Sequence, residues 1–123
     1  MEIEKNQKRE FYRIERVLPI EFEIKKNGVV IKEFGETFNI SGKGVAFDGN
    51  LLLKDKEDIK IIITIEDKKI ETLATIIAIS EHDENISKYK YRYRVMFKNI
   101  KKKMQNIILD YVWKEQLKKD TAK

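Results

Sequence analysis

The apolar residues of this chain repeat with two different periods, and the position of the change restricts the folds that the chain can adopt. As far as Asn99 they alternate with polar residues in short runs, which is typical of β-strands with one buried face. Beyond Asn99 they recur at three- and four-residue intervals, which is typical of an amphipathic helix. We therefore expect an all-β domain followed by one C-terminal helix, whose inward residues would be Met104, Ile107, Ile108, Tyr111 and Val112.

Turn signals divide the first part of the chain into strands. Asn27 and Gly28 predict a tight hairpin turn, because both residue types tolerate positive φ. Residues 59–80 predict a second hairpin, and residues 88–97 predict a final strand with Tyr, Val and Phe facing inward and Lys and Arg facing water. Gly35 is expected to mark a bulge or kink. Six or seven antiparallel strands closed by the helix would form a small β-barrel, which leaves no exposed sheet edge.

Composition narrows the possible functions. At 123 residues the chain has the length of one domain, and 26 Lys and Arg against 21 Asp and Glu give a formal charge of +5, which allows an anionic partner. There is no Cys, and the single His, His82, lies in a polar segment, so we expect no metal site and no enzyme. The N-terminus lacks the apolar region of a signal peptide, and no apolar run approaches the ~18 residues that cross a bilayer. We therefore expect a soluble cytoplasmic protein without membrane insertion.

Two short stretches carry the residues most suited to binding a ligand. Arg9 and Arg13 are four positions apart, immediately before the first alternating run, and Asn39, Ser41 and Gly44 lie between two expected strands. Guanidinium groups combine planar stacking, fixed charge and bidentate donation, which suits a ligand with purine rings and phosphates. Asn39 and Ser41 would add hydrogen-bonding groups, and Gly44 would permit close backbone approach or positive φ. Together they predict a guanine-nucleotide site.

These stretches also fit two motifs of a known family. Residues 9–13, R-E-F-Y-R, fit R-x-x-x-R, and residues 39–44, N-I-S-G-K-G, fit D/N-x-S-x-x-G. In this order and near this spacing, they resemble the motifs of PilZ domains, the bacterial receptors for cyclic di-GMP, and the resemblance extends from Lys8 to Leu117. It implies a six-stranded antiparallel barrel with a C-terminal helix, in agreement with the periodicity. The domains would then be a flexible N-terminal arm (1–8), a PilZ domain (9–119) and a disordered tail (120–123).

The resemblance implies a role for each motif residue. The ligand would be cyclic di-GMP, bound without any cofactor and without catalysis. Arg9 and Arg13 would clasp its guanine faces and phosphates. Asn39 and Ser41 would contact a guanine edge, and Gly44 would shape the turn.

Lys8 bears on the number of ligand molecules bound, and the N-terminal arm bears on how binding is signalled. A basic residue before the first motif arginine resembles the family members that bind an intercalated ligand pair, whereas a bulky apolar residue resembles the single-ligand type. As a hypothesis, cyclic di-GMP draws the arm across the barrel and so signals to a downstream protein partner, in control of motility, exopolysaccharide synthesis or a related output. The number of ligand molecules stays open, as does the choice between a monomer and a homodimer.

Two other functions stay open. The run from Lys88 to Arg94 interleaves Tyr with basic residues, as in a small-barrel nucleic-acid binder that stacks bases. Its period of two disfavours nucleic acid, because it turns the Tyr rings toward the core. The other alternative is a PilZ-fold module that has lost its ligand and binds proteins. Arg16, beyond the first motif, is interpreted as a solvated strand residue.

Overall fold

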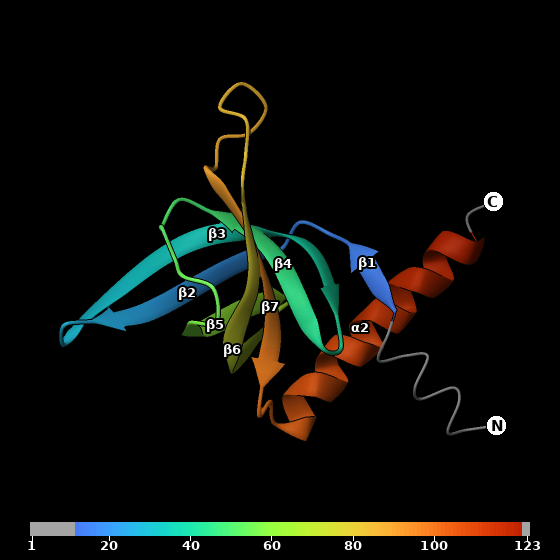
Figure 1. Ribbon diagram of the computed structural model, residues 1–123. Helices are drawn as coiled ribbons and strands as arrows, with labels where there is room; N and C mark the ends of the chain where they lie inside the picture. Colours follow the sequence, from blue (N-terminus) through green and yellow to red (C-terminus); the bar gives the residue numbers. More distant parts are fainter. Residues whose placement is uncertain (1–11, 122–123) are drawn as a thin grey trace.

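Seven strands and a C-terminal helix form the protein in its computed structural model, which describes residues 12–121 (Figure 1). The predicted N-terminal arm, residues 1–8, lies outside the described residues, and the helix extends past residue 119, the predicted end of the domain. In chain order the elements are β1 (Arg13–Glu15), β2 (Pro19–Lys26), β3 (Val29–Ser41), β4 (Gly44–Gly49), β5 (Asp58–Ile65), β6 (Lys68–Glu81), β7 (Tyr91–Lys98) and α2 (Lys102–Thr121).

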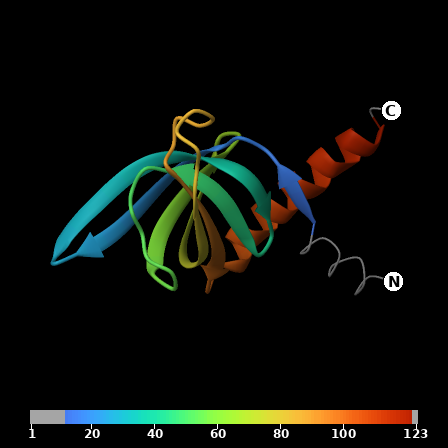
Figure 2. The same ribbon diagram turned by 45° about the horizontal axis from the view of Figure 1, so that its top comes forward.

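The sheet closes on itself. Its strands follow the order β3-β2-β5-β6-β7-β4, and β4 pairs again with β3, so six antiparallel strands form a closed barrel. β1 lies outside the barrel, where it pairs with the end of β3. Figure 2 shows the strands curving around the barrel, with β1 and α2 together on one side of it. The predicted antiparallel barrel with one C-terminal helix is therefore confirmed.

Both predicted hairpins are present, whereas the predicted bulge lies elsewhere. Asn27 and Gly28 have φ values of 51° and 78°, as the tight turn between β2 and β3 requires, and β5 and β6 form the second hairpin. Gly35 stays in register with β2, and the register of β3 shifts instead at Phe38. Glycine occupies position 35 for a steric reason, because a Cβ there would collide with the backbone carbonyl of Asp48 on β4.

Inward side chains of the six barrel strands fill the core. Phe22, Phe47 and Tyr93 are fully buried at its centre, with ring centroids 4.9 to 5.7 Å apart. The Tyr93 hydroxyl donates a hydrogen bond to the Leu51 carbonyl, and burial raises the pKa of Tyr93 above its ordinary value. The burial of Tyr93 and Val95 confirms the predicted inner face of the last strand. It also leaves Tyr93 inaccessible to a stacked base.

The last strand is shorter than predicted. β7 begins at Tyr91, opposite Glu81 at the end of β6, so the predicted start at Lys88 is wrong. Residues 82–90 instead form a connection that projects from the barrel (Figure 1), and within it Lys88 reaches Glu36 at 3.1 Å. The alternation of Tyr and Lys predicts a strand that is too long, because a β-strand also requires a neighbouring strand to pair with, and that pairing begins only at Tyr91.

The helix α2 packs across β1 and β3. Ile108 and Val112 are almost completely buried on its inner face, as the helical period predicts. Arg16, just after β1, donates a hydrogen bond to the Glu115 carboxylate on α2 at 3.1 Å. Arg16 is therefore partly exposed, as interpreted, but it also has a structural contact, because it connects the residues after β1 to the helix. No helix in the described region is long and apolar enough to span a bilayer.

Candidate ligand-binding site

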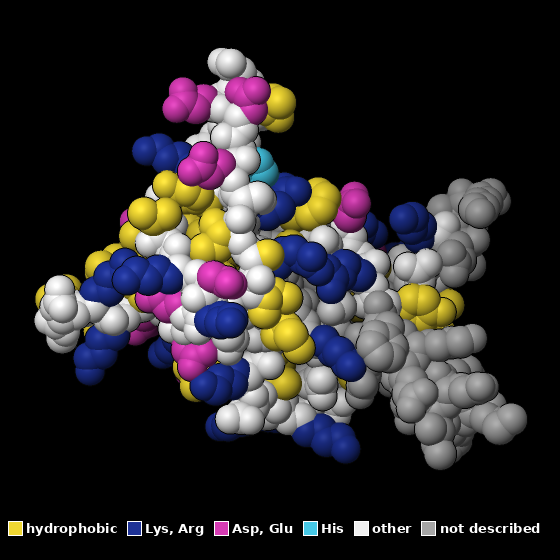
Figure 3. Space-filling model, in the orientation of Figure 1, with side chains coloured by type: hydrophobic (Ala, Val, Ile, Leu, Met, Phe, Trp, Pro, Cys, Tyr) yellow, Lys and Arg dark blue, Asp and Glu magenta, His cyan; other side chains and the backbone are white. Residues whose placement is uncertain are grey.

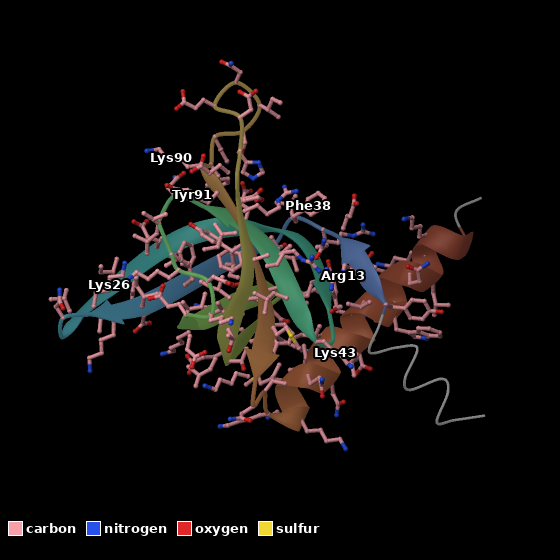
Figure 4. All side chains as sticks on the ribbon, viewed as in Figure 1. Arg13, Lys26, Phe38, Lys43, Lys90 and Tyr91 are labelled. Carbon is pink, nitrogen blue, oxygen red and sulfur yellow. The ribbon has the colours of Figure 1, made fainter. Side chains whose placement is uncertain are left out.

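The pairing of β1 with β3 brings the two predicted motifs together. Arg13 lies opposite Ser41 in the ladder, one strand away from Asn39. The exposed Arg13 guanidinium donates a long hydrogen bond, 3.4 Å, to the Asn39 side-chain oxygen. Figure 4 shows Arg13 on β1, on the side of the barrel that carries β4 and α2. The other two predicted basic contacts, Arg9 and Lys8, lie outside the described residues.

The turn between β3 and β4 is held by the predicted serine. The buried Ser41 hydroxyl oxygen accepts hydrogen bonds from the backbone N–H groups of Lys43 and Gly44, and the hydroxyl donates to the Gly44 carbonyl, all at 3.3 Å. The side chain of Gln105 on α2 donates to the Gly42 carbonyl at 2.9 Å. The serine and the helix therefore give this turn a fixed shape before any ligand binds, and contact between Ser41 and a guanine edge stays a prediction.

Gly44 allows close packing of two strands. Among the glycines of the described region, only Gly28 has a positive φ, so positive φ is not the reason for glycine at position 44. A Cβ on Gly44 would instead collide with the backbone carbonyl oxygen of Val95 on β7. The positive φ predicted for this glycine is therefore wrong, and the close backbone approach that the structure shows is to β7, while approach to a ligand stays a prediction.

A second group of polar side chains lies beside Asn39. Phe38, the bulged residue just before Asn39 on β3, has the guanidinium carbon of Arg92 3.8 Å from its ring centroid. Arg92 also donates to both carboxylate oxygens of Asp48, at 2.8 and 3.1 Å, and His82 Nε2 lies 2.9 Å from the same carboxylate. Arg92 therefore lies on the predicted outer face of the strand, but it is partly buried and paired rather than free in water. No local signal reveals this cluster, because Arg92 and Asp48 are 44 positions apart.

The cluster determines the ionisation of Asp48. Burial alone would raise the pKa of this carboxyl, but the hydrogen bonds from Arg92 and His82 outweigh burial, so its pKa lies below the ordinary 3.8. Asp48 therefore stays ionised and is compensated by Arg92 rather than repelling an anion at this surface. The described residues contain no group of three His, Cys, Asp or Glu side chains that could hold a metal ion.

We expect Asp48→Asn to lower the free energy of unfolding by about 2 kcal/mol at pH 7, because Arg92 would lose a charged partner in a half-buried site. Since the pKa of Asp48 is lower in the folded protein, its stabilising effect is present above the ordinary value of 3.8 and is lost as the pH falls through the folded pKa. Urea unfolding at pH 7 and at pH 2.5 measures the loss of unfolding free energy and its dependence on pH. The exposed Asp55→Asn is the control, and an Asp48→Asn deficit that is unchanged at pH 2.5 would contradict the prediction.

Comparison with known families identifies this arrangement. The sequence model of the PilZ domain matches residues 7–113. The chain belongs to the PilZ family. The resemblance of its two motifs is therefore confirmed at the level of the family, and the match covers both motifs and most of α2. No curated protein sequence is similar enough to this PilZ domain to be matched.

Solved structures share its fold at low sequence identity. The Bacillus subtilis inhibitor of motility, MotI (DgrA), is 23% identical with a TM-score of 0.71 over 88% of this chain and 51% of its own. The Escherichia coli YcgR PilZ domain with c-di-GMP is 15% identical with a TM-score of 0.66 over 91% and 95%. The K. pneumonia MrkH–c-di-GMP complex is 13% identical with a TM-score of 0.73 over 90% and 53%. The chain thus spans nearly all of the YcgR domain and about half of MotI and MrkH.

Proposed function

We propose that this PilZ domain is a receptor for cyclic di-GMP, which binds over β1, the end of β3 and the turn that follows. The observation that carries the proposal is the position of Arg13, which lies beside Asn39 next to a turn that Ser41 already holds in shape. The PilZ domain of YcgR and MrkH, which share this fold, were solved with c-di-GMP.

The geometry leaves the side chains of Arg13 and Asn39 available for a ligand. The single hydrogen bond between Arg13 and Asn39 is long, so both side chains can exchange it for shorter contacts at little cost. We assign Arg13 and Arg9 to the guanine faces and phosphates, and Asn39 and Ser41 to a guanine edge. Gly44 contributes by keeping the turn close to β7.

The output is proposed to pass through a protein partner rather than through catalysis. Binding by Arg9 and Lys8 would draw the N-terminal segment onto the barrel, and the newly covered surface would be recognised by the partner. Control of motility is the output that the MotI neighbour favours, since that protein is an inhibitor of motility. Exopolysaccharide synthesis is the alternative output.

Calorimetric titration with cyclic di-GMP, with GTP as a control ligand, tests the proposal. We expect saturable heat with cyclic di-GMP alone, and the fitted number of ligand molecules decides whether Lys8 supports a ligand pair. No heat from folded protein would favour a ligand-free interaction module instead. Limited proteolysis of the same samples tests the relay, because cleavage within residues 1–12 should slow when ligand is bound, and an unchanged cleavage rate would contradict it.

A further inference from the structure

The barrel places a third arginine in line with the predicted motif residues. In the strand ladder Asn39 on β3 lies opposite Ala46 on β4, and Ala46 lies opposite Arg94 on β7. Residues paired in an antiparallel ladder point to the same face of the sheet. Asn39 and Arg94 therefore share one row on the outer surface, two strands apart, with their Cα atoms about 10 Å from each other.

The residue between Asn39 and Arg94 in this row, Ala46 on β4, has a small side chain. Val45 and Phe47 point into the core, so Ala46 points outward, and its side chain is a single methyl group. In the neighbouring outward row the residue on β4 is also small. There Gly44 lies opposite Met96 on β7, and Arg13 lies opposite Ser41 at the end of β3. The outward residues of β4 at these two positions, Gly44 and Ala46, are thus small and buried, and they separate Arg13 on one side from the outward residues of β7 on the other.

The side chains of Arg92 and Arg94 differ in their contacts within the protein. Arg92 is occupied by Asp48 and by the ring of Phe38. The side chain of Arg94 is exposed, and it forms no hydrogen bond or ion pair with the other residues of the 12–121 range. Because Arg92 already compensates Asp48, the charge of Arg94 stays available to an anion. In Figure 3, Lys and Arg side chains gather on the face of the barrel that carries β4 and β7.

We infer that Arg94 forms the far wall of the ligand site and binds a phosphate of the cyclic dinucleotide, opposite Arg13. The inference rests on the proposed function. A cyclic dinucleotide carries two phosphates on opposite sides of its ring, so guanidinium groups from β1 and β7, on either side of β3 and β4, can each bind one of them. Each guanidinium can donate two parallel hydrogen bonds to a phosphate, which an ammonium group cannot reproduce.

Titration of Arg94→Ala with cyclic di-GMP tests the inference. We expect the affinity to fall about tenfold, which corresponds to one charge-assisted contact. Arg94→Lys keeps the charge but not the fork of donors, so we expect it to recover only part of the loss. Lys98→Ala is the matched control. Lys98 lies on the same outward face of β7, and its replacement by alanine removes the same positive charge. The ion pair that Lys98 forms with Asp58 is at the surface. We expect Lys98→Ala to bind within twofold of the wild type.

The outcomes separate the inference from the proposed function. Wild-type affinity in Arg94→Ala, with binding lost in Arg13→Ala, would overturn the role of Arg94 and leave the receptor function standing. Equal losses in Arg94→Ala and Lys98→Ala would show that only net charge matters, and would also overturn it. A folded wild-type protein that binds no cyclic di-GMP would overturn both proposals. Urea unfolding of each variant establishes that a loss of affinity is not a loss of folded protein.

Discussion

Arg13→Ala is expected to weaken the binding of cyclic di-GMP by at least about 100-fold, because it removes a guanidinium that can both stack on a guanine and donate two charged hydrogen bonds. The side chain is exposed and has one long internal hydrogen bond, so the free energy of unfolding should change by less than about 0.5 kcal/mol. Calorimetric titration and urea unfolding of the same preparation measure the two quantities. A threefold loss or less would show that Arg13 is not a ligand residue.

Arg16→Ala is the matched control for this experiment. Arg16 is three positions farther along the chain, and its side chain contacts Glu115 on α2 rather than the surface beside Asn39. The hydrogen bond from Arg16 lowers the pKa of Glu115, which indicates a favourable interaction between them. We expect Arg16→Ala to lose about 1 kcal/mol of stability and to keep its affinity for the ligand. If both arginine variants lost affinity equally, the effect would come from charge or from local structure rather than from the site.

Gly44→Ala is expected to reduce the free energy of unfolding by about 3 kcal/mol, because the added Cβ would collide with the Val95 carbonyl oxygen and push β4 away from β7. The obstacle is backbone, so no change of side-chain rotamer relieves it. Urea unfolding followed by circular dichroism measures the loss, and a loss below about 1 kcal/mol would show that the two strands separate easily. Ligand affinity should fall as well, since the turn beside Asn39 would move with β4.

Gly28→Ala separates this steric effect from the general cost of replacing glycine. Gly28 has a φ of 78° in the turn between β2 and β3, and nothing lies within 4 Å of the position that a Cβ would take. We therefore expect Gly28→Ala to lower the free energy of unfolding by only about 1 kcal/mol, the cost of a left-handed backbone conformation at alanine. The difference between the two variants measures how closely β4 and β7 approach each other.

The candidate site was accessible to sequence reasoning where its signals are local. Arg13, Asn39, Ser41 and Gly44 belong to two short motifs, and the second motif folds largely on itself through the Ser41 hydroxyl. The hidden parts come from strands far apart in the chain. Spacing indicates that Arg92 and Arg94 point outward, but only the register of β7 against β4 separates an arginine paired with Asp48 from one that stays available.

The sequence by itself determined the strand and helix periods, the hairpin turn at Asn27 and Gly28, and the existence of two ligand-type motifs, because each depends on residues close together in the chain. Only the tertiary structure decided that β1 lies outside the barrel, that the bulge falls at Phe38, and that Arg16 pairs with α2. These features depend on which strand lies beside which and at what register. That choice is made by the burial of the whole core, so no short stretch of sequence carries it.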